Sequence, residues 1–388
     1  MKIISVVGAR PNFMKIAPFV AAINKHNKQN PSRIIEHLLV HTGQHYDIRL
    51  SENFFSDLGI PQPDVNLEIG SGSHAEQVGH TMIAFEKVLQ EHKPDWVVVV
   101  GDVNATLACS VTAKKENIKC CHIEAGLRSG DMTMPEEINR LVTDRLSDLL
   151  LTPDRMSDEN LRKEGVPENK IRFVGNIMID TLEANREKAA SINIQQLLVK
   201  NAIEDTRITN QFYADKPYAV MTLHRPSNVD RREVLEPLLG FLINEVAVNM
   251  PLIWPIHPRT AKQLKTFNMW EKVIASRGIY LLHPLGYHDM LRLNMNARIM
   301  LTDSGGLQEE CCILGTPCLT LRWNTERPVT LREHGGASVL VGNNVERIRN
   351  EFNHTLQSDV LPARPELWDG HTAERIVELF AGEFWQSR

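Results

Sequence analysis

The sequence predicts two α/β domains of similar size, each built on a parallel β-sheet. Short β-branched runs alternate with longer amphipathic stretches along nearly all of the 388 residues. Runs such as Trp-Val-Val-Val-Val at 96–100 show no polar alternation, as expected for strands covered on both faces. A polar stretch with a helical pattern, residues 184–216, separates the strand-like runs into two groups. At about 150 residues per domain, the length predicts two or three domains.

Six strand-like runs precede residue 180 and six follow residue 215. Because helical patterns separate most of them, the economical arrangement is a parallel sheet with βαβ crossovers. The expected strands are 3–7, 34–40, 96–100, 119–123, 148–151, 171–174, 218–222, 252–256, 279–282, 299–301, 317–321 and 338–341.

The domain boundary is expected near residues 175–185, before the polar stretch. An amphipathic helix is expected over 371–384, and it follows Pro362 and Pro365. We expect this helix to return to the first domain. The predicted division is therefore residues 1–178 with 371–388, and residues 179–370.

Composition excludes several classes of protein. With 43 Lys and Arg against 48 Asp and Glu, the net charge is −5, which gives no electrostatic footprint for nucleic acid. No apolar run is long enough to cross a membrane, and the N-terminus resembles a first strand rather than a signal peptide. The six cysteines lack a C-x-x-C pattern and zinc-like spacing, so buried thiols in a cytoplasmic protein are expected.

Polar residues that follow strands are candidate ligand contacts, because ligands of parallel sheets bind beyond the carboxyl ends of strands. The first strand ends in Gly-Ala-Arg-Pro-Asn-Phe-Met-Lys, which places Arg10 and Lys15 near the start of a helix. Such a position favours an anion, although either side chain alone could be an ordinary surface residue. The motif is neither a P-loop nor G-x-G-x-x-G, which disfavours Walker-type NTPases and nicotinamide enzymes.

Carboxylates follow the next strands. Asp102 comes after the strand at 96–100, where it could serve only as a helix N-cap. Glu124 ends an otherwise apolar strand, where a carboxylate is costly unless it is paired or functional, and Arg128 is a candidate partner. Glu136 and Glu137 open a helix after a proline, where they could simply complement the helix dipole.

The second half carries histidines and a phosphate-like turn. His224 and Arg225 follow one strand, and His257 follows the next; such groups suit a phosphate oxygen or proton transfer. The strand at 299–301 runs through Thr-Asp into a small-residue turn and a helix, so its amides are expected to face an anion. The residues of this turn are Ser304, Gly305 and Gly306, and Glu310 and Arg327 follow them.

These features together fit a nucleotide diphosphate held by the second domain, with acid–base chemistry performed by carboxylates of the first. No metal site is expected, because Asp and Glu are not clustered at ligand spacing. Two Rossmann-like domains that face a sugar nucleotide across a cleft constitute the glycosyltransferase-B architecture.

The motifs occur in an order that resembles the non-hydrolysing UDP-N-acetylglucosamine 2-epimerases over essentially the whole chain. The matching pieces are GARPNFMKIAP, HTGQHYD, GDVNATLA, HIEAGLRSGD, MPEEINR, LTDSGGLQEE and NTERPVT. The resemblance implies an active site in the interdomain cleft, a homodimer and no cofactor. It also implies conversion of UDP-N-acetylglucosamine to UDP-N-acetylmannosamine by elimination of UDP to 2-acetamidoglucal, followed by re-addition.

The resemblance further implies roles for individual residues. The family's carboxylates fall on Asp102, Glu124 and Glu136, and its catalytic histidine falls on His224. Many bacterial members bind a second, activating substrate molecule. The residues of that binding site would match Gln44, His45, Arg225 and His257. The UDP-binding positions fall on Arg10, Lys15, Ser304, Gly305, Gly306, Glu310 and Arg327.

Several departures leave alternatives open. Between HIEAG and PEE the chain is two residues shorter than the common bacterial epimerases, and this segment resembles the UDP-2,3-diacetamido-2,3-dideoxyglucuronate 2-epimerases. A C6 carboxylate on such a substrate would need an extra cation, for which Arg128 or Arg140 could serve. Asp47 replaces a Gln of the activating site, which disfavours allosteric activation. The remaining alternatives are a hydrolysing epimerase, a glycosyltransferase and a non-catalytic nucleotide-sugar-binding protein.

Overall fold

The computed structural model describes residues 1–43, 59, 62–203, 216–358 and 361–385. The chain divides into two compact units, Met1–Ala184 with Glu366–Arg388, and Asn185–Pro365. We call them unit 1 and unit 2. The division thus falls at 184/185 and 365/366, whereas the sequence placed the boundaries at 178/179 and 370/371.

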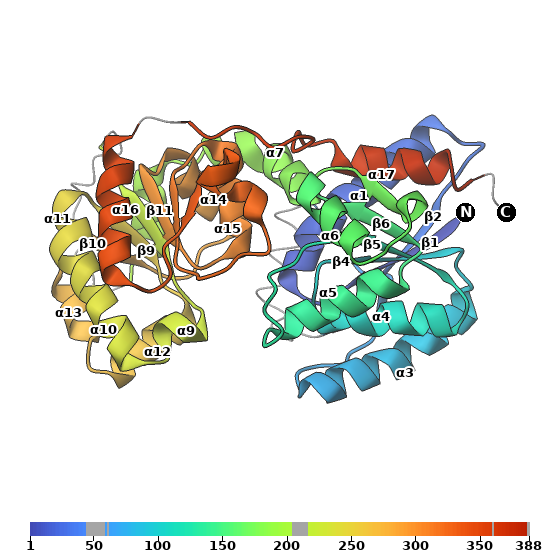
Figure 1. Cartoon of the computed structure of the whole chain (residues 1–388), viewed down its shortest axis with the longest axis horizontal. Helices are drawn as coiled ribbons and strands as arrows, with labels where there is room; N and C mark the ends of the chain where they lie inside the picture. Colours follow the sequence, from blue (N-terminus) through green and yellow to red (C-terminus); the bar gives the residue numbers. More distant parts are fainter. Residues whose placement is uncertain (44–58, 60–61, 204–215, 359–360, 386–388) are drawn as a thin grey trace. The chain divides into compact units, whose positions relative to one another are not determined.

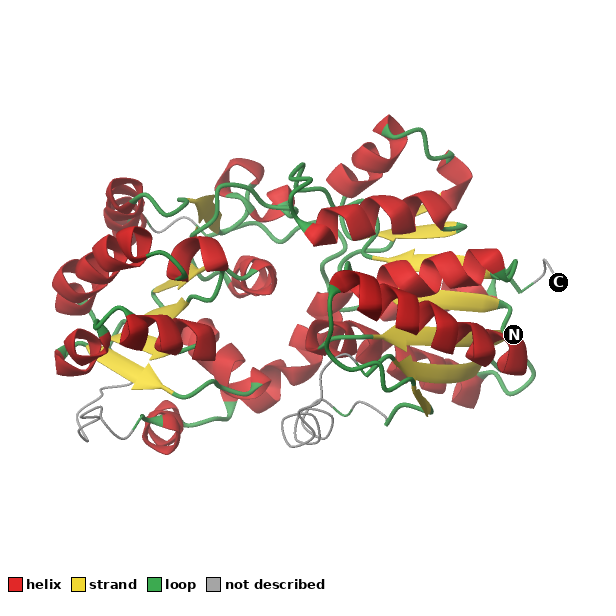
Figure 2. Cartoon of the chain, turned by 90° about the horizontal axis from the view of Figure 1, so that it is seen from below, coloured by secondary structure: helices red, strands yellow, loops and turns green. Residues whose placement is uncertain are grey.

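Unit 1 contains a seven-stranded parallel sheet in the order β3-β2-β1-β4-β5-β6-β7. Helices cover both faces of this sheet (Figure 1; Figure 2). Its strands are β1 (Lys2–Val7), β2 (Glu36–His41), β3 (Val65–Asn66), β4 (Trp96–Val100), β5 (Lys119–Ile123), β6 (Leu149–Thr152) and β7 (Ile171–Phe173). Its helices are α1 (Arg10–Gln29), α3 (His74–His92), α4 (Asn104–Lys115), α5 (Pro135–Leu146), α6 (Arg155–Lys163) and α17 (Thr372–Ala381), with a 3-10 turn at Glu168–Lys170.

Unit 2 contains a six-stranded parallel sheet in the order β10-β9-β8-β11-β12-β13. Its strands are β8 (Ala219–Thr222), β9 (Leu252–Pro255), β10 (Ile279–Leu282), β11 (Ile299–Thr302), β12 (Cys318–Thr320) and β13 (Ser338–Leu340). Helix α7 (Ile177–Ala190) spans the unit boundary, and α8 (Ile194–Asn201) follows it. The other helices are α9 (Pro226–Val229), α10 (Arg232–Phe241), a π-helical turn (Leu242–Val246), α11 (Ala247–Asn249), α12 (Pro258–Thr266), α13 (Trp270–Ala275), α14 (Tyr287–Asn296), α15 (Gly305–Leu314) and α16 (Val345–Gln357), with 3-10 turns at Pro328–Thr330 and Arg332–His334.

The predicted strands are confirmed, and their ends differ by at most two residues from those in the structure. The sequence analysis missed β3, an edge strand of two residues that is too short to produce a periodic pattern. The apolar runs are explained by burial on both faces. Ile3 packs with Phe19 of α1 and Phe380 of α17, whereas the adjacent Ile4 packs with Phe85 of α3. The chain therefore contains two Rossmann-like units, as the glycosyltransferase-B architecture requires.

The strand order reverses direction at one place in each sheet, between β1 and β4 in unit 1 and between β8 and β11 in unit 2. At such a place the connections that follow the two adjacent strands run in opposite directions. This opens a crevice at the carboxyl ends of the two central strands. The turns that follow these strands are therefore the places where each unit can take a ligand.

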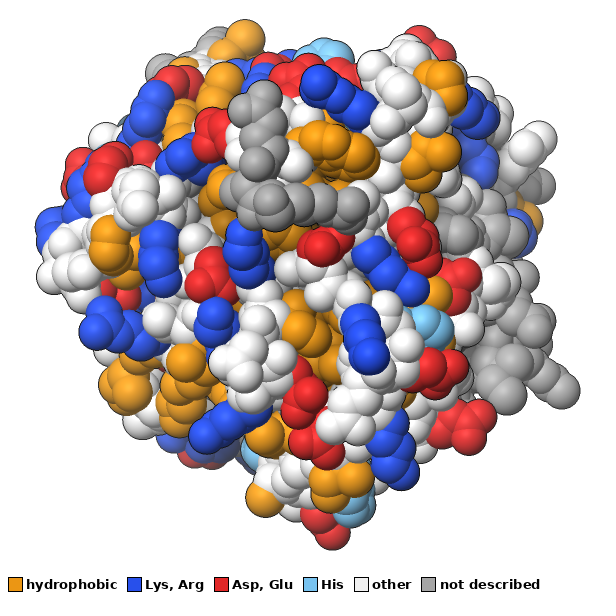
Figure 3. Space-filling model, turned by 90° about the vertical axis from the view of Figure 1, so that its right-hand side faces the viewer, with side chains coloured by type: hydrophobic (Ala, Val, Ile, Leu, Met, Phe, Trp, Pro, Cys, Tyr) orange, Lys and Arg blue, Asp and Glu red, His pale blue; other side chains and the backbone are white. Residues whose placement is uncertain are grey.

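The described part of the chain contains no helix that is long and apolar enough to cross a membrane. On the face drawn in Figure 3, basic and acidic side chains are intermingled among apolar ones. The described residues of this face therefore form no large basic patch of the kind that binds nucleic acid.

Helix α17 packs against α1, so the C-terminal segment returns to unit 1. Asp180 of α7 fixes its start. The Asp180 carboxylate is 6% exposed and accepts hydrogen bonds from the backbone N–H groups of Thr372 (3.1 Å) and Ala373 (2.7 Å). It thereby satisfies two of the amides that a helix N-terminus leaves without partners.

Replacing Asp180 with Ala removes both acceptors. We expect the unfolding free energy to fall by about 1–3 kcal/mol, and the backbone amides of α17 to exchange faster with deuterium in mass spectrometry. Glu378→Ala, on the exposed side of α17, is the matched control and should change stability by no more than about 0.5 kcal/mol. Unchanged exchange of α17 in Asp180→Ala would contradict the capping role.

Candidate active site

A buried ion pair occupies the carboxyl edge of the sheet in unit 1. Lys15, on the helix that follows β1, contacts the Oε2 atom of Glu124, which directly follows β5. Their side chains are 8% and 2% exposed. Among the described residues, the Oε1 atom of Glu124 has no hydrogen-bond partner. Glu124 therefore combines one oxygen held by a cation with one buried oxygen that can accept a proton.

The backbone around this ion pair adopts unusual conformations. Glu124 has a φ of +71°, which costs a residue other than glycine about 1–3 kcal/mol. Gly101, at the end of β4, has a φ of +69°, and a Cβ atom there would lie 3.3 Å from the Lys15 Nζ and 3.6 Å from the Glu124 Oε2. Glycine at 101 thus allows the two charged groups to approach the strand end.

Asp102 lies beside this pair in the sequence and is bound by Arg140 of α5. The Arg140 Nη1 donates to the Asp102 Oδ2 at 2.6 Å, and its Nη2 donates to the Glu137 Oε2 at 2.6 Å. Asp102 is not a helix N-cap, since Val103 is the N-cap of α4. The Asp102 carboxylate, which is 27% exposed, is therefore held by a charge network whose other two members, Arg140 and Glu137, are buried.

The two glutamates at the start of α5 differ in environment. Glu136 is exposed, whereas Glu137 is buried. Burial raises the pKa of Glu137, but hydrogen bonds from the Ser129 and Gly130 backbone and from Arg140 outweigh it and lower the pKa below its ordinary value. The sequence analysis gave Glu137 no site role. The i, i+3 spacing of Glu137 and Arg140 on one helix face was the available signal.

Arg128 does not pair with Glu124, so that expectation was wrong. Its guanidinium lies 2.7 Å from Asp144 and 2.7 Å from Glu164. Glu124 could bind Lys15 instead because its positive φ takes its side chain out of the alternation of β5. The two arginines proposed for a C6 carboxylate, Arg128 and Arg140, are thus both engaged in ion pairs.

Asn12 organises the same edge, although the sequence analysis assigned it no role. Its Oδ1 accepts from the backbone N–H groups of Gly8 (3.2 Å) and Ala9 (3.0 Å). Its Nδ2 donates to the Val100 carbonyl at 2.9 Å. Asn12 therefore ties the end of β1 to the end of β4, the two strands that flank the reversal point.

The reversal point of unit 2 carries a histidine–aspartate pair. The His224 Nδ1, after β8, lies 2.7 Å from the Oδ1 of Asp303, which follows β11 and is fully buried. Backbone N–H groups of His224 (3.0 Å) and Arg225 (2.8 Å) also donate to Asp303. Burial raises the pKa of Asp303, but the bond to His224 and the charge of His224 lower it below its ordinary value.

This arrangement fixes how His224 faces solvent. Because Nδ1 faces an ionised carboxylate, it carries a proton, and the Nε2 edge of the ring is the one available to a ligand. The side chain of His224 is 41% exposed. The sequence analysis assigned Asp303 no role, because an aspartate after a strand is common and its partner lies 79 residues away.

The predicted phosphate turn begins α15 as expected, with Ser304 as the N-cap. A Cβ atom at Gly305 would lie 2.9 Å from the Arg327 Nη1 and 3.0 Å from the Glu326 Oε1. Glycine therefore lets Arg327 reach the N-terminus of the helix. Cations and free helix amides at one place suit a phosphate group.

Arg327 belongs to a buried cluster that the sequence analysis found only in part. It pairs with Glu326 and with Glu309, and Arg322 pairs with Glu326 at 2.6 Å. Burial raises the pKa of Glu326, but the charges of Arg327 and Arg322 lower it well below its ordinary range. The cluster therefore holds Arg327 in place through ionised carboxylates, and Arg322 is an addition to the predicted residues.

Glu310 lies one turn into α15 and is buried. Burial raises its pKa to about 7, and the nearby charge of Glu309 contributes in the same direction. A carboxyl group with this pKa can change its protonation state when a ligand binds near neutral pH.

The structure describes only some of the residues predicted for the second-substrate site. The ring centroid of His257 lies 5.4 Å from that of His224, and burial followed by repulsion from His224 lowers the pKa of His257. Gln44 and His45 lie outside the described residues, as does the side chain of Arg10. The second-substrate site therefore stays a prediction.

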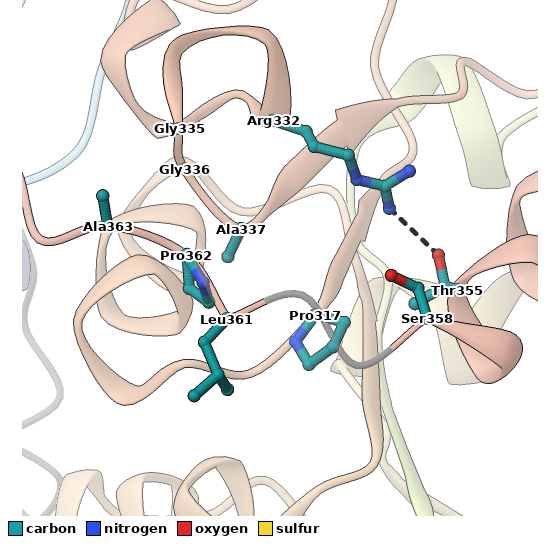
Figure 4. Close-up of a pocket in the computed structure, with 10 residues that line it drawn as sticks. All are labelled: Pro317, Arg332, Gly335, Gly336, Ala337, Thr355, Ser358, Leu361, Pro362 and Ala363. Atoms are coloured by element: carbon teal, nitrogen blue, oxygen red, sulfur yellow. Dashed lines mark hydrogen bonds between the residues drawn. The ribbon is translucent and has the colours of Figure 1, made fainter.

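A pocket of about 180 Å³ in unit 2 lies at the other edge of the sheet. Pro317 and Ala337, which line it, directly precede β12 and β13 (Figure 4). Arg332 points along its wall and donates to the Thr355 hydroxyl at 3.1 Å. This pocket is formed at the amino ends of strands, so it is separate from the carboxyl-edge residues of unit 2.

Comparison with known proteins extends these observations to the whole chain. The family model described as UDP-N-acetylglucosamine 2-epimerase matches residues 27–381. The UDP-N-acetylglucosamine 2-epimerase of Methanocaldococcus jannaschii is 41% identical over 98% of this chain and 98% of its own length. The UDP-2,3-diacetamido-2,3-dideoxy-D-glucuronate 2-epimerase of Pseudomonas aeruginosa is 37% identical over 98% of this chain and 99% of its own length.

The crystal structure of the Methanocaldococcus jannaschii UDP-GlcNAc 2-epimerase in complex with UDP-GlcNAc and UDP is similar throughout. It matches this chain with a TM-score of 0.85 at 40% identity, covering 98% of this chain and 99% of that one. Because the family model and these relatives match nearly the full length, the chain belongs to the UDP-N-acetylglucosamine 2-epimerase family.

Proposed function

We propose that this protein is a non-hydrolysing UDP-N-acetylglucosamine 2-epimerase, which inverts C2 to give UDP-N-acetylmannosamine. Family membership supports the reaction class. The observation that carries the proposal is the state of Glu124, whose Oε2 is held by Lys15 and whose buried Oε1 lacks a partner among the described residues.

The chemistry explains the need for such a carboxylate. The C2 proton of an N-acetyl sugar is weakly acidic, and no carbonyl group is adjacent to C2, so direct deprotonation and reprotonation is unfavourable. We propose that UDP is eliminated across C1 and C2 to give 2-acetamidoglucal. UDP then adds again while a proton returns to C2 from the opposite face. Closure of the protein would keep UDP trapped between the two steps.

Each part of the site has a role in this proposal. The Oε1 of Glu124 accepts the C2 proton, and Lys15 holds the other oxygen of this carboxylate in place. Asp102, held by Arg140, is the second acid–base candidate. The amides at the start of α15, together with Arg327 and the Nε2 edge of His224, stabilise the departing diphosphate. One substrate molecule must reach all these groups, and no cofactor is required.

The main alternative substrate is UDP-2,3-diacetamido-2,3-dideoxyglucuronate, the name of one relative. Its C6 carboxylate would require a free cation near the sugar. Arg128 and Arg140, the candidates for this cation, are both held in ion pairs within unit 1. The homodimer and the cytoplasmic location stay predictions of the sequence.

The test is incubation with UDP-N-acetylglucosamine in deuterium oxide, followed by proton NMR. We expect UDP-N-acetylmannosamine with deuterium at C2, and no accumulation of free UDP. A hydrolysing enzyme would release UDP and free N-acetylmannosamine. Binding of UDP without exchange at C2 would contradict the proposal and favour a glycosyltransferase or a binding protein. Parallel incubation with the diacetamidoglucuronate substrate separates the two epimerase activities.

In the same assay, Glu124→Gln should lower C2 exchange by about 100-fold or more, because general bases contribute about 10²–10⁴ to the rate, while UDP still binds. Glu91→Gln, an exposed change near the end of α3, is the control and should exchange at the wild-type rate. Near-normal exchange in Glu124→Gln would exclude it as the base.

Glu310 should make UDP binding release protons. We propose that its carboxylate accepts hydrogen bonds from the ribose hydroxyls, which favours the ionised form and lowers the pKa from about 7. Below pH 7 the free protein is mostly protonated at Glu310, so binding releases this proton, by about half a proton per UDP at pH 7. Calorimetry in buffers of different ionisation enthalpy measures the release.

Glu310→Gln is the control for this measurement, because it leaves the proton release of the UDP phosphates unchanged. The difference between the two proteins belongs to Glu310. Equal proton release from wild type and Glu310→Gln would contradict the ribose contact.

A further inference from the structure

His122 of β5 is fully buried, and both of its ring nitrogens face oxygen atoms. The Nδ1 lies 2.6 Å from the Asp144 Oδ1, and the Nε2 lies 2.8 Å from the Gly101 carbonyl oxygen. A carbonyl oxygen can only accept a hydrogen bond, so the Nε2 carries a proton.

The Asp144 carboxylate, which faces the Nδ1, has further partners. Its Oδ2 accepts from the Gly126 N–H at 3.0 Å and lies 2.7 Å from the Arg128 Nη1. Burial raises the pKa of Asp144, but the interactions with His122 and Arg128 lower it below its ordinary value. Both ring nitrogens of His122 are therefore committed to contacts within unit 1.

His122 belongs to a chain of four groups in contact. His122 contacts Asp144 of α5, Asp144 contacts Arg128, and Arg128 contacts Glu164 at the end of α6. The Asp144 side chain is 1% exposed, and a carboxylate buried this deeply persists when it is paired and hydrogen-bonded.

His122 is placed where regular strand pairing stops. The pairing of β4 with β5 ends at Val100 and Ile123. Beyond that point the Gly101 N–H still donates to the Ile123 carbonyl at 3.2 Å, and the Gly101 carbonyl accepts from His122. Gly101 directly precedes Asp102, and His122 is two residues before Glu124.

We propose that His122 is a positioning residue that fixes the two turns carrying Asp102 and Glu124. It does not touch substrate. Its two hydrogen bonds hold the Gly101 carbonyl against α5, so that both carboxylates keep their places beyond the last strand pair. The proposal rests on the proposed function, since it assigns these carboxylates to the reaction.

Backbone amide exchange with deuterium, read by mass spectrometry, tests the positioning role without enzymatic activity. In His122→Gln we expect faster exchange in the peptides that contain Gly101 and Glu124, because Gln does not reproduce the ring that joins the Gly101 carbonyl to Asp144. Exchange of these peptides at the wild-type rate would overturn the proposal. Because no substrate is needed, this readout is independent of the proposed function.

The effect on catalysis is tested with His122→Gln in the C2 exchange assay. Exchange should be at least about 10-fold slower than in wild type, with KM changed less than about 3-fold, since misplaced catalytic groups lower kcat. His37→Gln is the matched control, because His37 of β2 also contacts a buried group, the Ser5 hydroxyl, and it should keep the wild-type kcat.

A wild-type kcat in His122→Gln would overturn the positioning role, and so would an equal loss in His37→Gln. If His122→Gln does not fold, Asp144→Asn, which changes the partner of the Nδ1, takes its place in both measurements. Absence of C2 exchange in wild type would contradict the proposed function, and the deuterium exchange of His122→Gln would still test the positioning role.

Discussion

The contact between Lys15 and Glu124 is the interaction on which unit 1 depends. A carboxylate that is 2% exposed is tolerated only when a cation is close and well placed. The surrounding structure meets this condition at several points. Gly101 leaves room for the pair, the positive φ of Glu124 turns its side chain toward Lys15, and Asn12 ties β1 to β4. The cost of the arrangement is local strain, and its result is one proton-accepting oxygen.

The two units place charges differently, in keeping with different chemical tasks. Unit 1 holds carboxylates with cations, as Lys15 holds the buried Glu124 and Arg140 holds the partly exposed Asp102. Unit 2 uses carboxylates to hold cationic or polar groups, as Asp303 holds His224 and Glu326 holds Arg327. Acid–base chemistry needs carboxylates in fixed positions, and a leaving diphosphate needs positive groups in fixed positions. Each sheet presents its set beyond the carboxyl ends of its strands.

Most of the fold could be predicted from sequence because buried parallel strands leave continuous apolar runs. The candidate ligand-binding residues that follow strands were also recognisable, since their position after a strand and their residue type are both local features of the sequence. The ion-pair and hydrogen-bond partners of these residues were not recognisable. Asp303 and His224, or Asp102 and Arg140, are joined by folding across 79 and 38 residues. No local pattern specifies such pairs, which is why Arg128 was expected at Glu124 and why Arg322, Asn12 and Glu137 were missed.

A double-mutant cycle on the unfolding free energy tests the central claim most directly. Lys15→Met leaves the Glu124 carboxylate buried without its cation, and we expect urea unfolding to show a loss of about 3–5 kcal/mol. Adding Glu124→Gln removes the uncompensated charge, so the double variant should recover most of that loss. If the effects of the two single substitutions simply add, the ion pair is not what maintains this edge of the sheet, and the account of Glu124 as a carboxylate held by Lys15 is contradicted.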